Sequence, residues 1–210
     1  MLWRNNKRIR VFIVAVAMLA ICVVPCMLLA EDDSTFPHER RIKAAFLYNF
    51  LRFIEWPKEK MGDANEPMVI GLIGKDVFGD AFDDLKDRTI EDRPVVLKRF
   101  KGIDELKKED KDKKSEQHPQ IEAVRKSHLL FICPSEKQQI KEILKLVEGY
   151  GVLTVADTEG FLESGGMINL LTEDNKIHFE INITVTKEAE FQVRSKLLRL
   201  AKRVYEPKDK

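Results

Sequence analysis

Cysteine is scarce in this chain. Its 210 residues include three cysteines, and two of them, Cys22 and Cys26, lie within the first 30 residues. If that segment is removed, Cys133 is the single remaining thiol, and one thiol cannot form an intramolecular disulfide. A disulfide-stapled secreted fold is therefore excluded, and the domain must be stabilised by its hydrophobic core. Residues 31–210 suffice for this, because a domain of such a size buries roughly 70 % of its unfolded surface.

A surplus of positive charge is also missing. The chain has 36 Lys and Arg residues and 35 Asp and Glu residues. Four of the basic residues and none of the acidic ones lie in residues 1–30, which leaves 32 basic and 35 acidic residues in the rest. Proteins that bind nucleic acids neutralise phosphates with a net basic face. We therefore expect no nucleic acid among the partners.

The residue patterns of common catalytic and metal sites are lacking as well. There is no Gly-x-Ser-x-Gly and no Gly-x-Gly-x-x-Gly, and Gly74-Lys75-Asp76 has an acid where a phosphate-binding loop has Ser or Thr. The histidines are scattered without metal-ligand spacing, at His38, His118, His128 and His178. We therefore expect no enzymatic activity, no metal and no cofactor.

The first 30 residues have the pattern of an export signal. Four cations precede an uncharged run over residues 11–30, and acidic residues begin at Glu31. The run contains 20 residues, enough to span a membrane as a helix, so an uncleaved N-terminal anchor is the alternative to a cleaved signal peptide. Either outcome places residues 31–210 across the membrane. Contact with the membrane would then occur only through a partner or the uncleaved segment.

The rest of the chain alternates between apolar runs and segments of helical pattern, which predicts an α/β fold. Strands are expected at 68–74, 94–100, 129–133 and 152–156. Two later runs, 167–171 and 177–183, predict a hairpin, and residues 195–204 predict a closing helix. The expected architecture is a mainly parallel sheet with helices on both faces and an added antiparallel hairpin near the C-terminus.

Residues 107–120 interrupt this pattern. The stretch has no apolar side chain and mixes both signs of charge, so it cannot bury surface to offset the entropy of ordering. We expect a mobile, charged surface insertion within a single domain formed by residues 31–210.

A helix expected over residues 42–56 is rich in aromatic side chains. Its polar residues Asn49, Arg52 and Glu55 fall on one narrow stripe, and apolar side chains cover the remaining arc. Such a helix supports the core first, and part of its wide arc is expected to meet a partner or a second subunit. The candidate interface residues are Phe46, Tyr48, Asn49, Phe50, Phe53 and Trp56.

Acidic residues gather after the fourth predicted strand. Open parallel sheets bind ligands beyond the carboxyl ends of their strands, and Asp157, Glu159 and Glu163 lie there. A solvated loop is the alternative interpretation. The candidate ligand pocket consists of Asp157, Glu159, Gly165, Gly166 and Asn169.

Several segments together resemble a known family. Lys-Ala-Ala-Phe-Leu-Tyr-Asn-Phe at 43–50, with Phe-Ile-Glu-Trp-Pro at 53–57, is similar to the opening of the YfiR-like family of periplasmic regulators. Later segments agree in the family's order: Ile-Gly-Leu-Ile-Gly (70–74) with Phe-Gly (78–79), Val-Leu-Thr-Val-Ala-Asp (152–157) with Gly-Phe (160–161), Gly-Gly-Met-Ile-Asn (165–169), and Phe-Glu-Ile-Asn (179–182) with Ser-Lys-Leu-Leu-Arg-Leu-Ala (195–201).

The resemblance implies a non-enzymatic periplasmic protein that binds and restrains the periplasmic part of an inner-membrane diguanylate cyclase. Such restraint lowers cyclic di-GMP and biofilm formation. The alternative function is a periplasmic small-ligand-binding sensor subunit for a membrane kinase or receptor, and a homodimer is a further association to consider. The chain departs from the family in its longer charged insertion and in lacking the disulfides of well-studied members.

Overall fold

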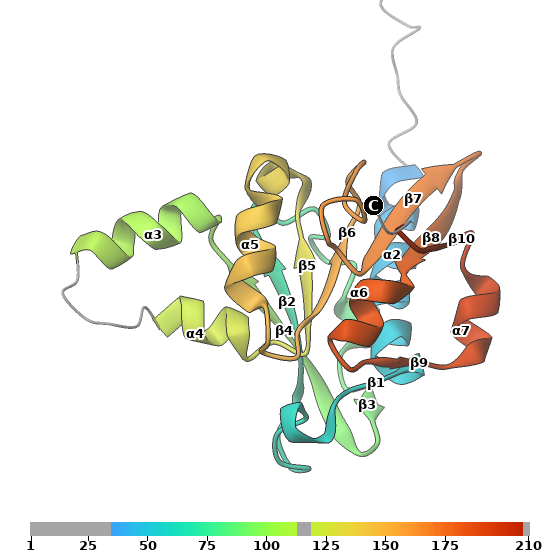
Figure 1. Ribbon diagram of the computed structural model, residues 1–210, viewed down its shortest axis with the longest axis horizontal. Coiled ribbons are helices and arrows are strands. Elements are labelled where there is room, and N and C mark those ends of the chain that lie inside the picture. Colours follow the sequence, from blue (N-terminus) through green and yellow to red (C-terminus); the bar gives the residue numbers. More distant parts are fainter. Residues whose placement is uncertain (1–34, 113–118, 208–210) are drawn as a thin grey trace, which may run out of the picture. The chain divides into compact units, whose positions relative to one another are not determined.

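The computed structural model describes residues 35–112 and 119–207 (Figure 1). The expected signal peptide or anchor, residues 1–30, lies outside these ranges and remains a prediction. Of the described residues, 38–112 and 119–207 belong to one compact unit. No helix in the described part of the chain is long and apolar enough to cross a membrane.

An eight-stranded sheet forms the centre of this unit, with the order β10-β8-β7-β6-β5-β2-β4-β3. The strands from β4 to β7 pair in parallel, β7 and β8 form an antiparallel hairpin, and β10 joins β8 in parallel. The predicted fold class is thereby confirmed. The strand bounds are β2 Met68–Ile73, β3 Thr89–Ile90, β4 Arg93–Phe100, β5 Leu129–Ile132, β6 Leu153–Ala156, β7 Ile168–Glu173, β8 Lys176–Asn182 and β10 Arg203–Tyr205.

Helices and a small ribbon surround the sheet. The ribbon pairs β1, Ile54–Glu55, with β9, Gln192–Val193, in antiparallel fashion. The helices are α2 Thr35–Phe53, α3 Ile103–Asp112, α4 Pro119–Arg125, α5 Ile140–Val147, α6 Ile183–Glu188 and α7 Ser195–Leu200, with 3-10 turns η2 Lys58–Lys60, η3 Asp83–Leu85 and η4 Pro134–Gln139.

The two faces of the sheet carry separate hydrophobic clusters, because successive side chains of a strand point to opposite faces. Leu129 and Phe131 of β5 pack in the cluster that includes α2. Leu130 and Ile132 of the same strand pack in a second cluster with α3, α4 and α5. The apolar strands are thus covered on both faces, as parallel sheets require.

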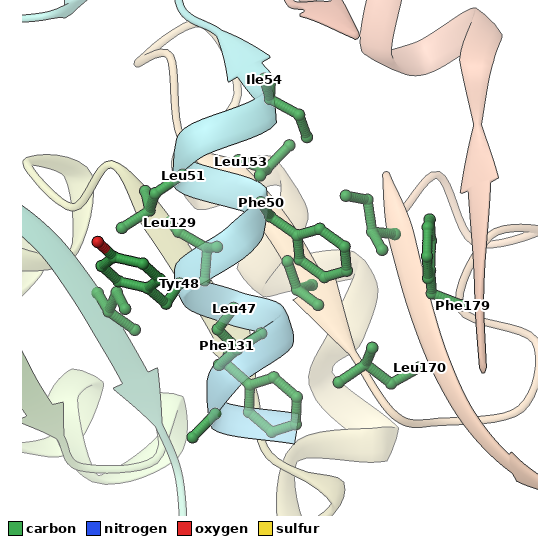
Figure 2. Close-up of a cluster of buried hydrophobic side chains, with 14 of the residues drawn as sticks. Leu47, Tyr48, Phe50, Leu51, Ile54, Leu129, Phe131, Leu153, Leu170 and Phe179 are labelled. Carbon is green, nitrogen blue, oxygen red and sulfur yellow. The ribbon is translucent and has the colours of Figure 1, made fainter. Parts of the chain in front are cut away.

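Helix α2 lies in the core. Leu47 and Phe50 are fully buried, and the rings of Phe50 and Phe179 meet edge to face with centroids 5.3 Å apart (Figure 2). The helix ends at Phe53, earlier than expected, because Ile54 and Glu55 leave it to pair with β9. The proline at position 57 disfavours helix in the residue before it, which fits this early end.

The β7–β8 hairpin closes in a tight two-residue turn. Asp174 and Asn175 both have positive φ, 48° and 58°, as the turns that suit the twist of a hairpin require. Asp and Asn tolerate this conformation better than most residues. Both strands consequently extend further toward the turn than the sequence predicted.

Two segments differ from their predicted structure. The closing helix ends at Leu200, and Arg203–Tyr205 form β10 because they pair with β8. The charged stretch expected as a loop over residues 107–120 is helical at both described ends, since α3 continues to Asp112 and α4 begins at Pro119. The start of α3 is anchored by Ile103 and Leu106, which are buried in the second cluster.

Candidate functional site

A cavity of about 550 Å³ lies beyond the carboxyl end of β6. The segment 157–163 after β6 forms one wall, and parts of β7, β8 and β10 form the others. Three residues of the predicted ligand pocket line it, namely Asp157, Glu159 and Asn169. The position agrees with the general rule for ligand sites in open parallel sheets.

The two predicted glycines do not join this cavity. Gly165 lines a different cavity of about 590 Å³, beside α5 and α6. Gly166 lines neither of the two, and a β-carbon placed on it would lie 2.2 Å from the ring of Phe161. Glycine at position 166 therefore allows the Phe161 ring to pack against the backbone, where any larger residue would clash with it.

Lys43 connects α2 to the cavity. Its Nζ donates to the carboxylate of Asp157 and lies 2.7 Å from Glu39 Oε1. Glu39 also accepts a hydrogen bond of 2.8 Å from the hydroxyl of Thr172. Burial alone would lower the pKa of Lys43, but the bonds to Asp157 and Glu39 outweigh it and raise the pKa. Lys43 is therefore a fixed cation behind the acidic wall.

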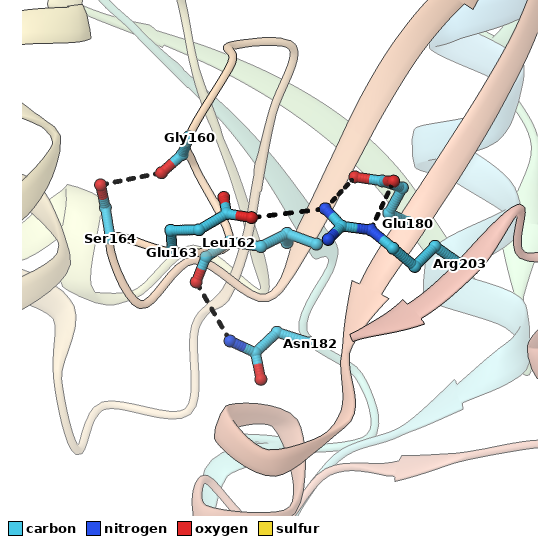
Figure 3. Close-up of polar contacts among 7 residues, drawn as sticks. All are labelled: Gly160, Leu162, Glu163, Ser164, Glu180, Asn182 and Arg203. Carbon is cyan, nitrogen blue, oxygen red and sulfur yellow. Dashed lines mark hydrogen bonds and ion pairs between the residues drawn. The ribbon is translucent and has the colours of Figure 1, made fainter. Parts of the chain in front are cut away.

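Arg203 holds two carboxylates at the opposite side of the cavity (Figure 3). The register of β10 on β8 places Arg203 opposite Glu180, and its Nε and Nη2 donate to the two oxygens of Glu180 at 2.7 and 2.8 Å. Its Nη2 also lies 3.4 Å from Glu163 Oε1. The hydrogen bonds to Glu180 are the largest cause of the raised pKa of Arg203.

Two neutral side chains line the cavity more deeply. Thr158 and Asn169 are only 6 % and 8 % exposed. The backbone N–H of Thr158 donates to Asn169 Oδ1 at 3.0 Å. Since a backbone N–H can only donate, this bond fixes the orientation of the amide, and Asn169 Nδ2 must point elsewhere.

The cavity as a whole is acidic. Lys43 is shared by two carboxylates, and Arg203 is shared by two others. Each cluster therefore keeps one negative charge in excess, and the exposed Glu159 adds a third. An excess of like charge at a concave, partly desolvated site attracts ligands of the opposite sign.

The aromatic residues of the candidate interface divide into two groups. Tyr48, Phe50 and Trp56 are buried in the α2 cluster, so another chain cannot reach them without unfolding this region. Phe46, Asn49 and Phe53 are half-buried at the surface of the same helix. Only the second group remains available for contact with a partner.

A buried polar connection at the base of the sheet was not predicted. His128 Nδ1 accepts the N–H of Val69 at 3.1 Å, and Nε2 lies 3.2 Å from the carbonyl oxygen of Met61. Nε2 also lies 3.3 Å from Arg93 Nη2, so a positive charge on the ring would face the guanidinium of Arg93. Burial is the largest cause of the lowered pKa of His128, and the nearby charge of Arg93 adds to it. Because the partners of His128 are groups of the protein itself, we assign the ring to support of the fold and not to a ligand site.

The remaining chemistry-bearing groups are inert or already occupied. Burial raises the pKa of Cys133 to about 12, so its thiol is not reactive. The carboxylate of Glu136 accepts the N–H of Ile103 at the first turn of α3, where an anion would otherwise bind. Within residues 35–112 and 119–207, no group of three His, Cys, Asp or Glu side chains is placed to hold a metal ion.

Sequence reasoning missed the groups that complete the cavity. The sequence predicts helix at Arg203, which instead begins β10, and no residue pattern marks Thr158 between Asp157 and Glu159. Lys43 contacts Asp157 across 114 positions of sequence, which no local pattern reveals. The one readable signal was the spacing of Glu39 and Lys43, four residues apart on a helix, which favours an ion pair.

Comparisons with known proteins agree with this fold. A conserved domain protein from Vibrio cholerae O1 biovar eltor has 8 % sequence identity and a TM-score of 0.53 over 79 % of this chain. The ABC domain from Streptococcus pneumonia, solved in complex with L-Trp, has 8 % identity and a TM-score of 0.53 over 77 % of this chain. This chain spans 60 % of the length of each, and such low identities show a shared fold alone.

Comparison of sequences is more specific than comparison of structures, because it identifies a family. No curated protein sequence matches the chain at a significant level. The sequence pattern of the YfiR/HmsC-like family matches residues 40–202, which include most of α2, the strands β1 to β9 and α7. The match contains all the cavity residues described above except Glu39 and Arg203. The chain therefore belongs to the YfiR/HmsC-like family.

Proposed function

We propose that this protein is a non-enzymatic periplasmic regulator that binds the periplasmic part of an inner-membrane diguanylate cyclase and restrains it. The observation that carries the proposal is the family match over residues 40–202, because YfiR-like proteins are known as periplasmic regulators. Restraint of the cyclase would lower cyclic di-GMP and biofilm formation. The proposal requires that residues 1–30 direct the rest of the chain across the inner membrane.

The half-buried residues of α2 are the proposed docking surface. Phe46, Asn49 and Phe53 lie on one helix, and their backbone is already ordered by the core beneath it. Two cations flank the ring of Phe53, with Lys196 Nζ 5.5 Å and Arg52 Cζ 5.7 Å from its centroid. An aromatic side chain beside cations suits a partner surface that combines apolar and acidic groups.

Affinity capture tests this surface directly. The tagged full chain is captured from membranes of cells that also express the candidate cyclase, and the cyclase is detected by immunoblot. Phe53→Ala should reduce the cyclase recovered at least fivefold and should destabilise the protein less than loss of a fully buried ring, because Phe53 is only partly buried against the core. A matched control is Tyr150→Ala, since Tyr150 is an exposed aromatic, 44 % accessible, that packs against Arg125 of α4.

The outcomes separate the surface from the function. Equal loss of capture in both variants would show that Phe53 is not specific, and full capture with Phe53→Ala would remove α2 as the docking surface. Failure of the parent protein to capture any diguanylate cyclase would contradict the proposed function.

The second candidate function is a small-ligand-binding sensor subunit for a membrane kinase or receptor. The acidic cavity beyond β6 favours it, because the cavity volume lies in the range of small-molecule sites. In that case deletion of the gene would alter the output of the kinase or receptor and leave cyclic di-GMP unchanged.

A further inference from the structure

The cavity beyond β6 contains buried polar groups that the protein itself does not satisfy. Asn169 Oδ1 accepts the N–H of Thr158, but no partner for Asn169 Nδ2 exists among the described residues. The hydroxyl of Thr158 has no partner in that part of the chain either. Both side chains are more than nine-tenths buried, and both line the cavity. A buried polar group without a partner costs free energy, so such groups mark a place where something else binds.

The charge of the same cavity defines the ligand. Four carboxylates and a single cation, Arg203, belong to its wall. Arg203 donates to both oxygens of Glu180 and to Glu163 Oε1, so these two carboxylates together keep one negative charge in excess. Asp157 is paired with Lys43, so Glu159 is the acid of the wall for which the described residues provide no ion pair.

We propose that this cavity binds a small organic cation. The ammonium or guanidinium group of this cation faces Glu159. It also faces the oxygens of Asp157 and Glu163 that are not bonded to Lys43 or Arg203. A hydrogen-bond acceptor next to that group, such as a hydroxyl or carbonyl oxygen, accepts from Asn169 Nδ2 and from the hydroxyl of Thr158. The volume of about 550 Å³ accommodates a molecule of several non-hydrogen atoms.

The same chemistry could be supplied by a free amine or by a lysine or arginine side chain of another protein. The inference does not depend on the cyclase, because it concerns the isolated chain. Its failure would leave the proposed regulatory function intact, and failure of the capture experiment would leave this site intact.

Calorimetric titration of the purified protein, in the form in which cells produce it, tests the site. The probes are ethanolamine, arginine methyl ester and a blocked lysine tripeptide, and succinate is the anionic control of similar size. We expect at least one cationic probe to bind, more weakly at high salt, and succinate not to bind. Binding of the free amines identifies a small molecule, whereas binding of the tripeptide alone identifies a protein side chain.

Thr158→Val is the decisive variant, because it removes the unpartnered hydroxyl and keeps the shape and the backbone bond to Asn169. It should weaken the binding of the cation about tenfold and leave the melting temperature unchanged or higher. The matched control is Thr186→Val, since the buried Thr186 hydroxyl donates to the carbonyl oxygen of Asn182 outside the cavity. That control should lower the melting temperature and leave the affinity unchanged.

Three results would overturn the inference. One is that no cationic probe binds at millimolar concentration. Another is that succinate binds as tightly as the amines. The third is that Thr158→Val binds the cation with the affinity of the parent protein.

Discussion

The ring of Phe161 lies against the backbone of Gly166. A β-carbon at Gly166 would come within 2.2 Å of Phe161 Cε1, and the N–H of Gly166 donates to the carbonyl oxygen of Phe161 at 2.9 Å. Phe161 is itself fully buried in the second cluster. This contact fixes the loop after β6, and with it the wall that carries Thr158 toward the cavity.

Gly166→Ala should destabilise the protein by about 1–3 kcal/mol, as expected when a group is forced into a packed core. Chemical denaturation measures the free energy of unfolding. In a Phe161→Leu background the cost should fall, because the smaller side chain makes room for the new methyl group. Gly160→Ala is the control, since φ at Gly160 is 78° but nothing lies within 4 Å of its β-carbon position. The cost at Gly160 should be equal in both backgrounds, and equal costs at Gly166 would contradict the packing explanation.

Phe50→Ala should cost about 3–5 kcal/mol, because Phe50 is fully buried and truncation leaves a cavity next to Phe179. Phe46→Ala, on the same helix but half-buried, should cost roughly half as much. Thermal unfolding followed by circular dichroism compares the two variants. If Phe50→Ala melts like the parent protein, α2 is not part of the core.

Stability should decrease at mildly acidic pH because of His128. Its pKa in the folded protein is lowered from 6.5, so the unfolded chain binds the proton more tightly. The stabilisation is therefore fully present above pH 6.5 and is lost as the pH falls from about 6.5 through the folded pKa. Urea unfolding between pH 7.5 and 5 should show a loss of stability that His128→Gln reduces. Parallel curves for the two proteins would exclude His128 as the cause.

Redox conditions should not affect the isolated chain. Cys133 is buried, and its thiol with a pKa of about 12 stays protonated. Reductant should leave the melting temperature unchanged, and Cys133→Ala should cost about 1 kcal/mol through lost packing alone. A dimer that appears on non-reducing gels and disappears with reductant would show that Cys133 is accessible.

The central strands could be predicted from the sequence, and the last strand, β10, could not. The run from Leu129 to Ile132 is apolar on both faces, which identifies a buried parallel strand without tertiary information. Residues 203–205 are strand only because β8 offers them a partner, and strand preference depends on such context. Their local pattern continued the apolar spacing of the preceding helix, so it predicted more helix.

The candidate site could be predicted only in part, because some of its residues come together only through tertiary packing. Asp157 and Glu159 follow the fourth predicted strand, and the carboxyl end of a parallel strand predicts a ligand pocket there. Asn169 lies at the start of β7, paired with Ala156 at the end of β6. The pair formed by Lys43 and Asp157 joins segments 114 residues apart, so it depends on the packing of α2. Gly165 and Gly166 belong to the predicted pocket, whereas in the structure Gly166 allows close approach of the Phe161 ring.

The most direct test of the proposed function is the cyclic di-GMP content of four strains, measured by mass spectrometry. The strains are the parent, a deletion of this gene, a deletion of the cyclase gene and the double deletion. Deletion of this gene should raise cyclic di-GMP and surface adhesion several-fold, and the double deletion should return both to the level of the cyclase deletion. Unchanged cyclic di-GMP in the single deletion, in cells shown to express the cyclase, would contradict the account.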